Sequence, residues 1–263
     1  MLSPPLPARG RGAAWSALLF CQNLIFWILF FAAGAVVIPI ATLIVALTRV
    51  VSSHRVTMRR IRRSISWYGW TILCCGWPFA RAKYRDFAPE QASGPFIFIC
   101  NHRSASDPFL MALLPYECVQ IVNIWPFKLP VLGIAARIAG YLSVREMPVE
   151  EFYEKGARVL AEGACIIAFP EGTRSGSRVM GPFNSSIFRL GQQCRATFVP
   201  LAISGNERIP PKGSLVLHPG RIHVDKLPAV TWQDYQDMDA FQLKNHVRRL
   251  LGEHLNRIEK DAA

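Results

Sequence analysis

Acidic residues are missing from the first third of this chain. All eighteen aspartate and glutamate residues lie beyond Arg85, whereas eleven of the thirty lysine and arginine residues lie at or before it. The nineteen basic residues that follow nearly balance the acidic ones, so most of the net charge of +12 belongs to the N-terminal segment. A nucleic-acid-binding protein would carry this charge on a face of its folded domain. The distribution argues against nucleic acid as a partner and favours anionic lipid head groups.

Charged side chains are also absent from Gly12 to Thr48, a segment rich in Leu, Ile, Phe and Trp. A straight helix of this length would be roughly 55 Å long, whereas the hydrocarbon core of a bilayer is about 30 Å thick. We therefore expect the helix to break or turn near Gly34 and Pro39, where it would be weakest.

Arginines flank this apolar segment on both sides, and basic flanks prefer the cytoplasmic face of a membrane. A re-entrant or two-helix hairpin with both ends in the cytoplasm satisfies length and charge together. A single tilted span with its N-terminus outside is a second possibility, and a signal peptide cleaved near Ala33-Gly34-Ala35 is a third. The favoured arrangement predicts a protein of the inner or plasma membrane whose catalytic domain faces the cytoplasm.

Paired-cysteine motifs are lacking as well. None of the seven cysteines has C-x-x-C spacing, so the sequence predicts neither a zinc site nor a disulfide framework, and we expect no metal. Cysteines inside apolar runs are typical of small core residues, which fits a reducing compartment.

Three regions follow from composition. Residues 1–11 are expected to be disordered, 12–85 to form a membrane anchor with basic and interfacial helices, and 86–263 to form the catalytic domain. Residues 65–79, which contain tryptophan and tyrosine, predict an interfacial helix, with a buried helix of the globular domain as the alternative. From Asp86 onward apolar runs alternate with helical stretches, which predicts an α/β fold with a mixed, mostly parallel sheet flanked by helices.

Period and length define the expected elements. The predicted strands are 96–100, 118–122, 165–169, 197–203 and 215–217, with 221–224 as a possible hairpin partner. The predicted helices are 108–114, 132–139, 149–162, 185–193 and a C-terminal helix with an apolar stripe between Phe241 and Ile258.

The first of two polar blocks, residues 101–107, directly follows an apolar strand, and strand ends are where α/β enzymes assemble their chemistry. Within it, His102 and Asp107 are separated by four residues, and Pro108 suits the first turn of a helix. Asp107 could accept from one ring nitrogen and leave the other free to take a proton from a hydroxyl. The alternative is that the pair only caps the helix.

The second block, residues 169–175, follows another apolar run. Its glycine lets a backbone amide approach a developing oxyanion, and its guanidinium can grip a phosphate. A plain surface turn is the alternative interpretation.

In these residues the chain resembles the lysophospholipid and glycerol-phosphate acyltransferase family, whose best-known members are the 1-acylglycerol-3-phosphate O-acyltransferases. Residues 101–107 resemble the family's N-H-x-S-x-x-D block and residues 169–175 match its F-P-E-G-T-R-S block. Residues 127–133 and 199–203 resemble two further blocks. The resemblance extends over residues 86–224. The order of the four blocks is specific to the family, whereas any single block could occur by chance.

The resemblance implies acyl transfer from an acyl carrier protein or coenzyme A thioester to a lysolipid hydroxyl, without a covalent acyl-enzyme, a metal or another cofactor. It implies that His102 is the base and that Asp107 orients it and stabilises its charged form. The Gly172 amide would help to hold the oxyanion.

The same resemblance implies a substrate-binding set. Thr173 and Arg174 would bind the phosphate of the acceptor, Glu171 would order this loop or bind a glycerol hydroxyl, and Ser104 is included as a further substrate-binding residue.

Departures from the family pattern reduce the positive charge expected around the acceptor. Asn184 stands where the family often has lysine, Glu146 stands where arginine is expected, with Arg145 one place early, and Lys128 lies closer to Pro130 than the usual lysine. We therefore hypothesise an acceptor less anionic than lysophosphatidic acid, such as an amino-acid-containing lipid. Two competing hypotheses are an acyltransferase for a glycolipid and a non-catalytic lipid-binding protein of the same fold.

Overall fold

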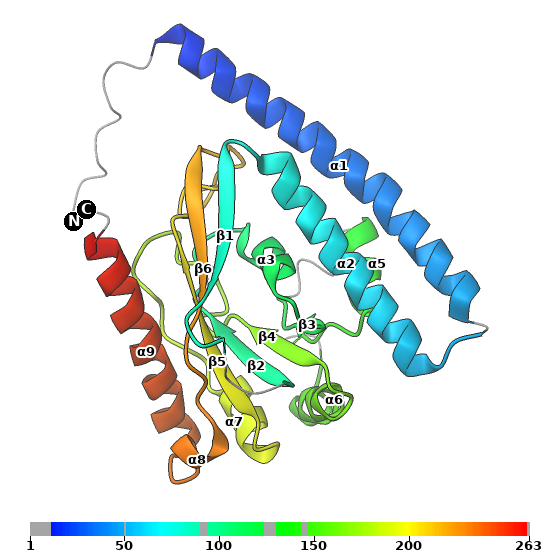
Figure 1. The fold of residues 1–263 in the computed structure, drawn as a ribbon, viewed down its shortest axis with the longest axis vertical. Helices are drawn as coiled ribbons and strands as arrows, with labels where there is room; N and C mark the ends of the chain where they lie inside the picture. The colour runs from blue at the N-terminus through cyan, green and yellow to red at the C-terminus, as the bar shows by residue number, and fades with distance from the viewer. Residues whose placement is uncertain (1–11, 50, 90–93, 124–129, 144–146, 262–263) are drawn as a thin grey trace.

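A six-stranded sheet forms the centre of the computed structural model, which describes residues 12–49, 51–89, 94–123, 130–143 and 147–261 (Figure 1). The strand order is β1-β6-β5-β2-β4-β3. Only β5 and β6 pair antiparallel among these neighbours, and the other pairs are parallel. The predicted mixed, mostly parallel sheet is therefore confirmed. The expected disorder of residues 1–11 lies outside the described residues.

Four predicted strands are present with nearly the expected bounds. They are β2 (Phe96–Cys100), β3 (Cys118–Gln120), β4 (Cys165–Ala168) and β5 (Thr197–Ser204). The possible strand at 221–224 is β6 (Gly220–Lys226), which pairs with β5 and β1. The prediction for residues 215–217 was wrong, because the backbone of Leu217 bonds to the side chain of Asn23 instead of to a strand.

One strand was not expected from the sequence. β1 (Ala80–Asp86) pairs in parallel with β6 at the edge of the sheet. Arg81 and Lys83 are exposed along it, so the strand lacks the apolar run that reveals a buried one. The sheet thus begins six residues before Asp86, where composition placed the start of the catalytic domain.

Helices cover both faces of the sheet. One face packs against α6 (Val149–Ala161), α7 (Ser186–Gln193) and α9 (Ala240–Asp261), while α8 (Trp232–Tyr235) lies before α9. The other face packs against α2 (His54–Gly76), α3 (Asp107–Leu110) and the 3-10 turn η1 (Met111–Leu113). α5 (Pro130–Ile138) lies beside α1 and α2 (Figure 1).

The expected break in the apolar N-terminal segment does not occur. α1 (Ala13–Arg49) is one continuous helix that contains Pro39. Gly34 serves packing and not a turn, because a Cβ at this position would lie 3.3 Å from the hydroxyl of Tyr68 in α2. The chain turns only after Arg49, so that α1 and α2 lie side by side (Figure 1). The prediction of a hairpin within the apolar segment was therefore wrong, and α1 packs against α2 instead.

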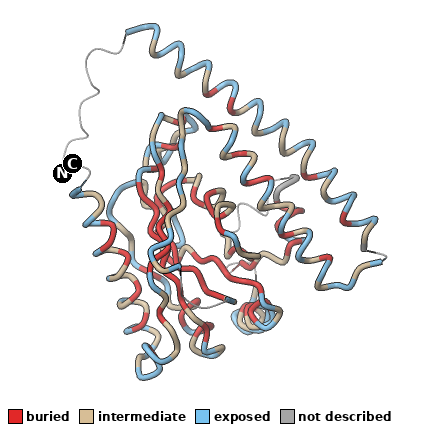
Figure 2. The backbone as a smooth tube through the Cα atoms, viewed as in Figure 1, coloured by how far each residue is buried: buried red, intermediate tan, exposed pale blue. Residues whose placement is uncertain are grey.

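Much of α1 is apolar and exposed (Figure 2). Among the described residues it is the one helix long and apolar enough to cross a membrane, by length and composition, and only 11% of its most apolar window is buried. The interfacial helix expected at 65–79 is the second half of α2, where Trp67 and Trp70 are exposed and Tyr68 is buried.

Two of the arginines that follow the apolar segment form ion pairs inside the protein. Arg55 and Arg62 of α2 donate to the carboxylate of Glu117 at 2.6 and 2.8 Å, and the Arg62 side chain is only 3% exposed. These bonds fix α2 against the start of β3. These two arginines are therefore not available to bind lipid head groups, although the sequence suggested this role for all the arginines of this segment.

Candidate active site

His102 and Asp107 form a hydrogen-bonded pair where β2 ends. The Nδ1 of His102 lies 2.6 Å from Oδ2 of Asp107, which is fully buried. Because an ionised carboxylate only accepts, Nδ1 carries the hydrogen and Nε2 is left with its lone pair. The His102 side chain is 19% exposed, and Nε2 has no hydrogen-bond partner among the described residues. This geometry suits a general base, as the spacing predicted.

Backbone and side-chain donors surround the Asp107 carboxylate. Its Oδ2 also accepts the backbone amides of Arg103 and Ser104 at 2.7 and 2.9 Å. Its Oδ1 accepts from the side-chain amide of Asn206, which is buried in the turn after β5. These donors fix the orientation of the carboxylate, so its bond to His102 has one defined direction. Asn206 was missed from the sequence because it lies far along the chain.

The start of this loop is locked into the sheet. The Asn101 side chain donates to the carbonyl of Ile203 at 2.9 Å and accepts its amide at 2.7 Å, which extends the pairing of β2 with β5. The residue next to His102 is therefore held as firmly as a strand residue.

The two predicted blocks meet at His102. Glu171 accepts the backbone amide of His102 at 2.7 Å, and the Ser175 amide donates to the His102 carbonyl at 2.8 Å. The ring of Phe169 packs on the imidazole with centroids 4.8 Å apart. Burial raises the pKa of Glu171, while the amides of His102 and Gly181 oppose that change. Glu171 thus orders the loop, one of the two roles implied for it.

The remaining residues of the second block lie at the surface of the site. Gly172 has a φ of +69° and its amide donates to the carbonyl of Phe169 at 3.0 Å. That amide is committed to the turn, so the oxyanion role expected for it does not follow from this geometry. Thr173 is exposed, and Arg174 is half-buried without a hydrogen bond or ion pair to any residue that the structure describes. The donors of its guanidinium are therefore unpaired within the described part of the chain.

Ser104 differs from its expected role. It is fully buried, and its hydroxyl donates to the carbonyls of Ile209 and Pro210 at 2.7 and 3.0 Å. The hydroxyl holds the loop in place and cannot reach a substrate.

Arg103 is a further residue that the sequence did not single out. Its side chain is 1% exposed and donates to Glu207 and to Glu259 near the end of α9, the latter at 2.6 Å. It also donates to the carbonyl of Arg178, at 3.1 Å. Arg103, in the first polar block, thus connects α9 to the loop that contains Arg178, just after the second block.

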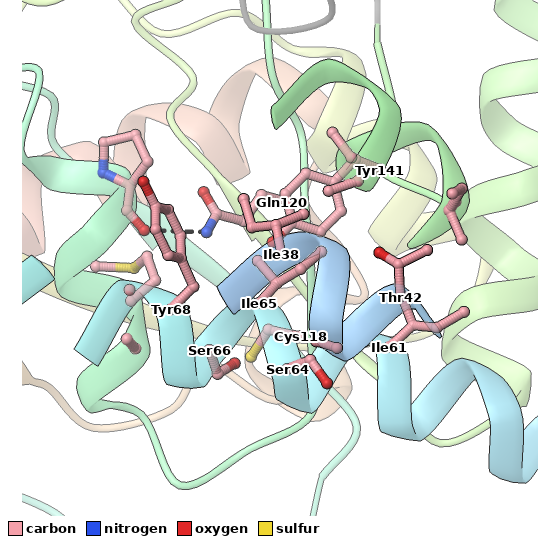
Figure 3. Close-up of a pocket in the computed structure, with 18 of the residues that line it drawn as sticks. Ile38, Thr42, Ile61, Ser64, Ile65, Ser66, Tyr68, Cys118, Gln120 and Tyr141 are labelled. Carbon is pink, nitrogen blue, oxygen red and sulfur yellow. Dashed lines mark hydrogen bonds between the residues drawn. The ribbon is translucent and has the colours of Figure 1, made fainter. Parts of the chain in front are cut away.

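An apolar cavity of about 610 Å³ lies between α1, α2, α3, α5 and β3 (Figure 3). Its wall includes Ala105 and Pro108 of the His102 loop, while Ile38 and Thr42 of α1 and Ile61 of α2 line it elsewhere. Gln120 lies in the wall and donates to the Pro108 carbonyl at 3.0 Å. The cavity thus borders the loop that carries the base.

Some predictions lie outside the described residues, namely those for Lys128, Arg145 and Glu146. Asn184 is described: its side-chain oxygen accepts the amide of Ser186, the first residue of α7, at 2.9 Å. Within the described ranges, no group of three or more His, Cys, Asp or Glu side chains is arranged to hold a metal ion.

Comparison with known proteins supports the resemblance. The acyltransferase family model matches residues 81–204. A 1-acyl-sn-glycerol-3-phosphate acyltransferase of Cocos nucifera is 25% identical over 222 residues, which cover 75% of this chain and 72% of the relative. The enzyme of that name from Limnanthes alba is 31% identical over 53% of this chain and 51% of its own length.

A solved structure shares the fold. The 1-acyl-sn-glycerophosphate acyltransferase PlsC of Thermotoga maritima superposes with a TM-score of 0.75 at 18% identity, over 92% of this chain and 98% of the other. This likeness concerns the fold, whereas the family model and the relatives above confirm the predicted resemblance to the 1-acylglycerol-3-phosphate O-acyltransferases.

Proposed function

We propose that this chain, whose residues 81–204 match the acyltransferase family model, is a membrane-bound O-acyltransferase that moves a fatty acyl group from a thioester to a lysolipid hydroxyl. The observation that carries this proposal is the free Nε2 of His102, which lies opposite the bond to Asp107. A base in this position is what activation of a hydroxyl requires.

The reaction follows from that geometry. The acceptor hydroxyl gives its proton to Nε2 of His102 while its oxygen attacks the thioester carbonyl carbon, and Asp107 stabilises the imidazolium. Collapse of the tetrahedral intermediate breaks the carbon–sulfur bond, and the thiolate takes the proton back from His102. The products are the acylated lipid and the free thiol. No acyl group is attached to the protein at any step.

The oxyanion needs a donor that is not already committed. The Gly172 amide would serve only after turning away from Phe169, and a glycine at positive φ makes such a change inexpensive. We assign Gly172 this role in the substrate complex.

We propose a 1-acylglycerol-3-phosphate as the acceptor. Arg174 supplies a guanidinium suited to a phosphate. We assign Lys212 as a second cation, because its side chain is exposed and its Cβ packs against Gly176, two residues beyond Arg174: a Cβ on that glycine would lie 2.6 Å away. The sequence suggested too little positive charge for a phosphate, but spacing along the chain could not reveal Lys212.

The less anionic lysolipid is the second candidate. The exposed Asn184 favours it, since the side chain that replaces the family's lysine is neutral and already bonded to Ser186.

The membrane location rests on the exposed apolar surface of α1. We propose that α1 enters the bilayer, that the catalytic domain faces the cytoplasm, and that the apolar cavity receives an acyl chain. Either acyl carrier protein or coenzyme A would carry the donor thioester.

An assay of purified protein in vesicles tests these proposals. Lysophosphatidic acid and neutral or amino-acid-containing lysolipids would be offered separately with each type of thioester, and products identified by mass. The phosphate acceptor should be preferred, and Arg174→Ala should raise its KM at least tenfold while Arg189→Ala, an exposed position in α7, leaves it unchanged. Equal rates on a neutral lysolipid would overturn the phosphate assignment, and no acyl transfer to any acceptor would overturn the function.

A further inference from the structure

The connection between β5 and β6, residues 205–219, supports the catalytic pair. Asn206 donates to Oδ1 of Asp107, and the carbonyls of Ile209 and Pro210 accept the Ser104 hydroxyl. The loop that carries His102 is therefore held by this connection as well as by its own strand.

The other end of the same connection is bonded to α1. The Asn23 side chain donates to the carbonyl of Leu217 at 3.0 Å and accepts its amide at 2.7 Å. The Trp27 indole donates to the carbonyl of Leu215 at 3.1 Å. Asn23 is buried in a mostly apolar helix, and a buried amide is costly unless it is bonded in this way. These bonds offset the cost of burying the polar Asn23 side chain in α1.

The tip of the connection is apolar and exposed. Leu215 is 69% exposed and Val216 is 41% exposed, directly beside the residues that bond to α1. On α1, Leu24 and Ile28 are also exposed, at 50% and 58%. Exposed apolar side chains continuous with such a helix indicate one shared lipid-facing surface.

We propose that the β5–β6 connection enters the lipid surface beside α1 through Leu215 and Val216. We also propose that it is a positioning element, through which the position of α1 in the membrane determines the orientation of Asp107. The inference rests on the membrane location proposed above. Asn23 fixes one end of the connection to the membrane helix, and Asn206 fixes the other to the catalytic carboxylate. Neither asparagine contacts the reacting atoms, so both act through the orientation of His102.

Photo-crosslinking tests the lipid contact independently of activity. The full chain would carry p-benzoylphenylalanine at position 215, 28 or 241 in vesicles of phosphatidylethanolamine and phosphatidylglycerol, and lipid adducts would be detected by mass. Position 28 reports on α1, and Phe241, 62% exposed at the start of α9, is the aqueous control.

Adducts at 28 and 215 but not at 241 are expected. An adduct at 28 without one at 215 would overturn this inference and leave the membrane location standing. No adduct at 28 would overturn both, and equal adducts at all three positions would show that the contact is unspecific and reject the inference.

Kinetics test the positioning role. Asn23→Ala and Asn206→Ala should each lower kcat on vesicle-bound acceptor by roughly tenfold with little change in KM, because a small misplacement of a base is costly. Ile25→Ala, at a 57% exposed position of the same helix, is the matched control and should leave kcat unchanged.

A double variant provides the decisive comparison. If both asparagines act along one route, Asn23→Ala with Asn206→Ala should lower kcat no further than Asn206→Ala alone. Independent, multiplying losses would overturn the positioning role. Trp27→Phe, which removes only the donor to Leu215, replaces Asn23→Ala if that variant does not fold, and an unchanged kcat in it would count equally against the role.

Discussion

The carboxylate of Glu171 accepts the backbone amide of His102 at 2.7 Å, across sixty-nine positions of sequence. Its other oxygen accepts the amide of Gly181, also at 2.7 Å. Two blocks that are separate in the chain are therefore one structure around the imidazole. Because both carboxylate oxygens accept backbone amides, Glu171 acts as a structural residue that joins the two loops, not as a proton carrier.

This arrangement predicts a pH-dependent stability. Because burial raises the pKa of Glu171, the folded chain holds the proton more tightly than the unfolded chain. Its stabilising contribution is complete below the ordinary value of 4.5 and is lost as the pH rises through the folded-state pKa. Glu171→Gln lacks this titration, so the wild type should gain stability relative to the variant as the pH falls from 7.

Thermal unfolding of both proteins in detergent at several pH values measures the difference. Glu154→Gln, whose carboxylate is 70% exposed, is the matched control. A difference between wild type and Glu171→Gln that does not change with pH would contradict the prediction.

The catalytic pair predicts a large loss of rate. His102→Ala removes the base and should lower kcat by about 10³-fold or more, and Asp107→Asn, which cannot orient the same tautomer, should come close to that loss. Steady-state assays in vesicles measure both. His246→Ala, at a half-buried position of α9 where the ring bonds to Arg249 of the same helix, should retain full activity. Retention of activity by His102→Ala would remove the base assignment.

Arg103 predicts a stability effect. Arg103→Met leaves Glu207 and Glu259 without their buried cation and should destabilise the fold by about 3–5 kcal/mol. Adding Glu259→Gln should recover part of this loss, since one unpaired charge is removed. Chemical unfolding measures the change, with Arg249→Met as the control because its pair with Glu253 is exposed. Equal losses in the two arginine variants would show that burial of Arg103 is unimportant.

The cavity predicts a change in acyl-chain preference. Thr42→Phe fills part of the wall that α1 contributes, and each methylene that no longer fits forfeits about 0.8 kcal/mol. Rates with the longest accepted thioester should fall roughly tenfold, while short-chain rates are kept. Leu43→Phe, at a 59% exposed neighbouring position, is the control. Parallel losses at all chain lengths would place the acyl chain elsewhere.

Local patterns predicted most of the sheet and helices correctly, but they failed where a residue's partner was remote. Gly34 and Pro39 suggested a break because single-helix propensities disfavour them, whereas α1 is one continuous helix in which Gly34 packs against Tyr68 of α2. The apolar residues 215–217 suggested a strand, but the segment bonds to α1. β1 was hidden because an edge strand with alternating arginine and lysine resembles the basic segment before it.

By itself the sequence determined the α/β class and the two polar blocks and indicated the pairing of His102 with Asp107, because these depend on short-range periodicity and on residues only five positions apart. The tertiary structure alone decided that Asn206 and Glu171 hold that pair, that Glu259 bonds to the neighbouring Arg103, and that Ser104 supports the loop instead of binding substrate. The physical reason is that these bonds join segments whose approach is set by the packing of the whole sheet, which no local pattern encodes.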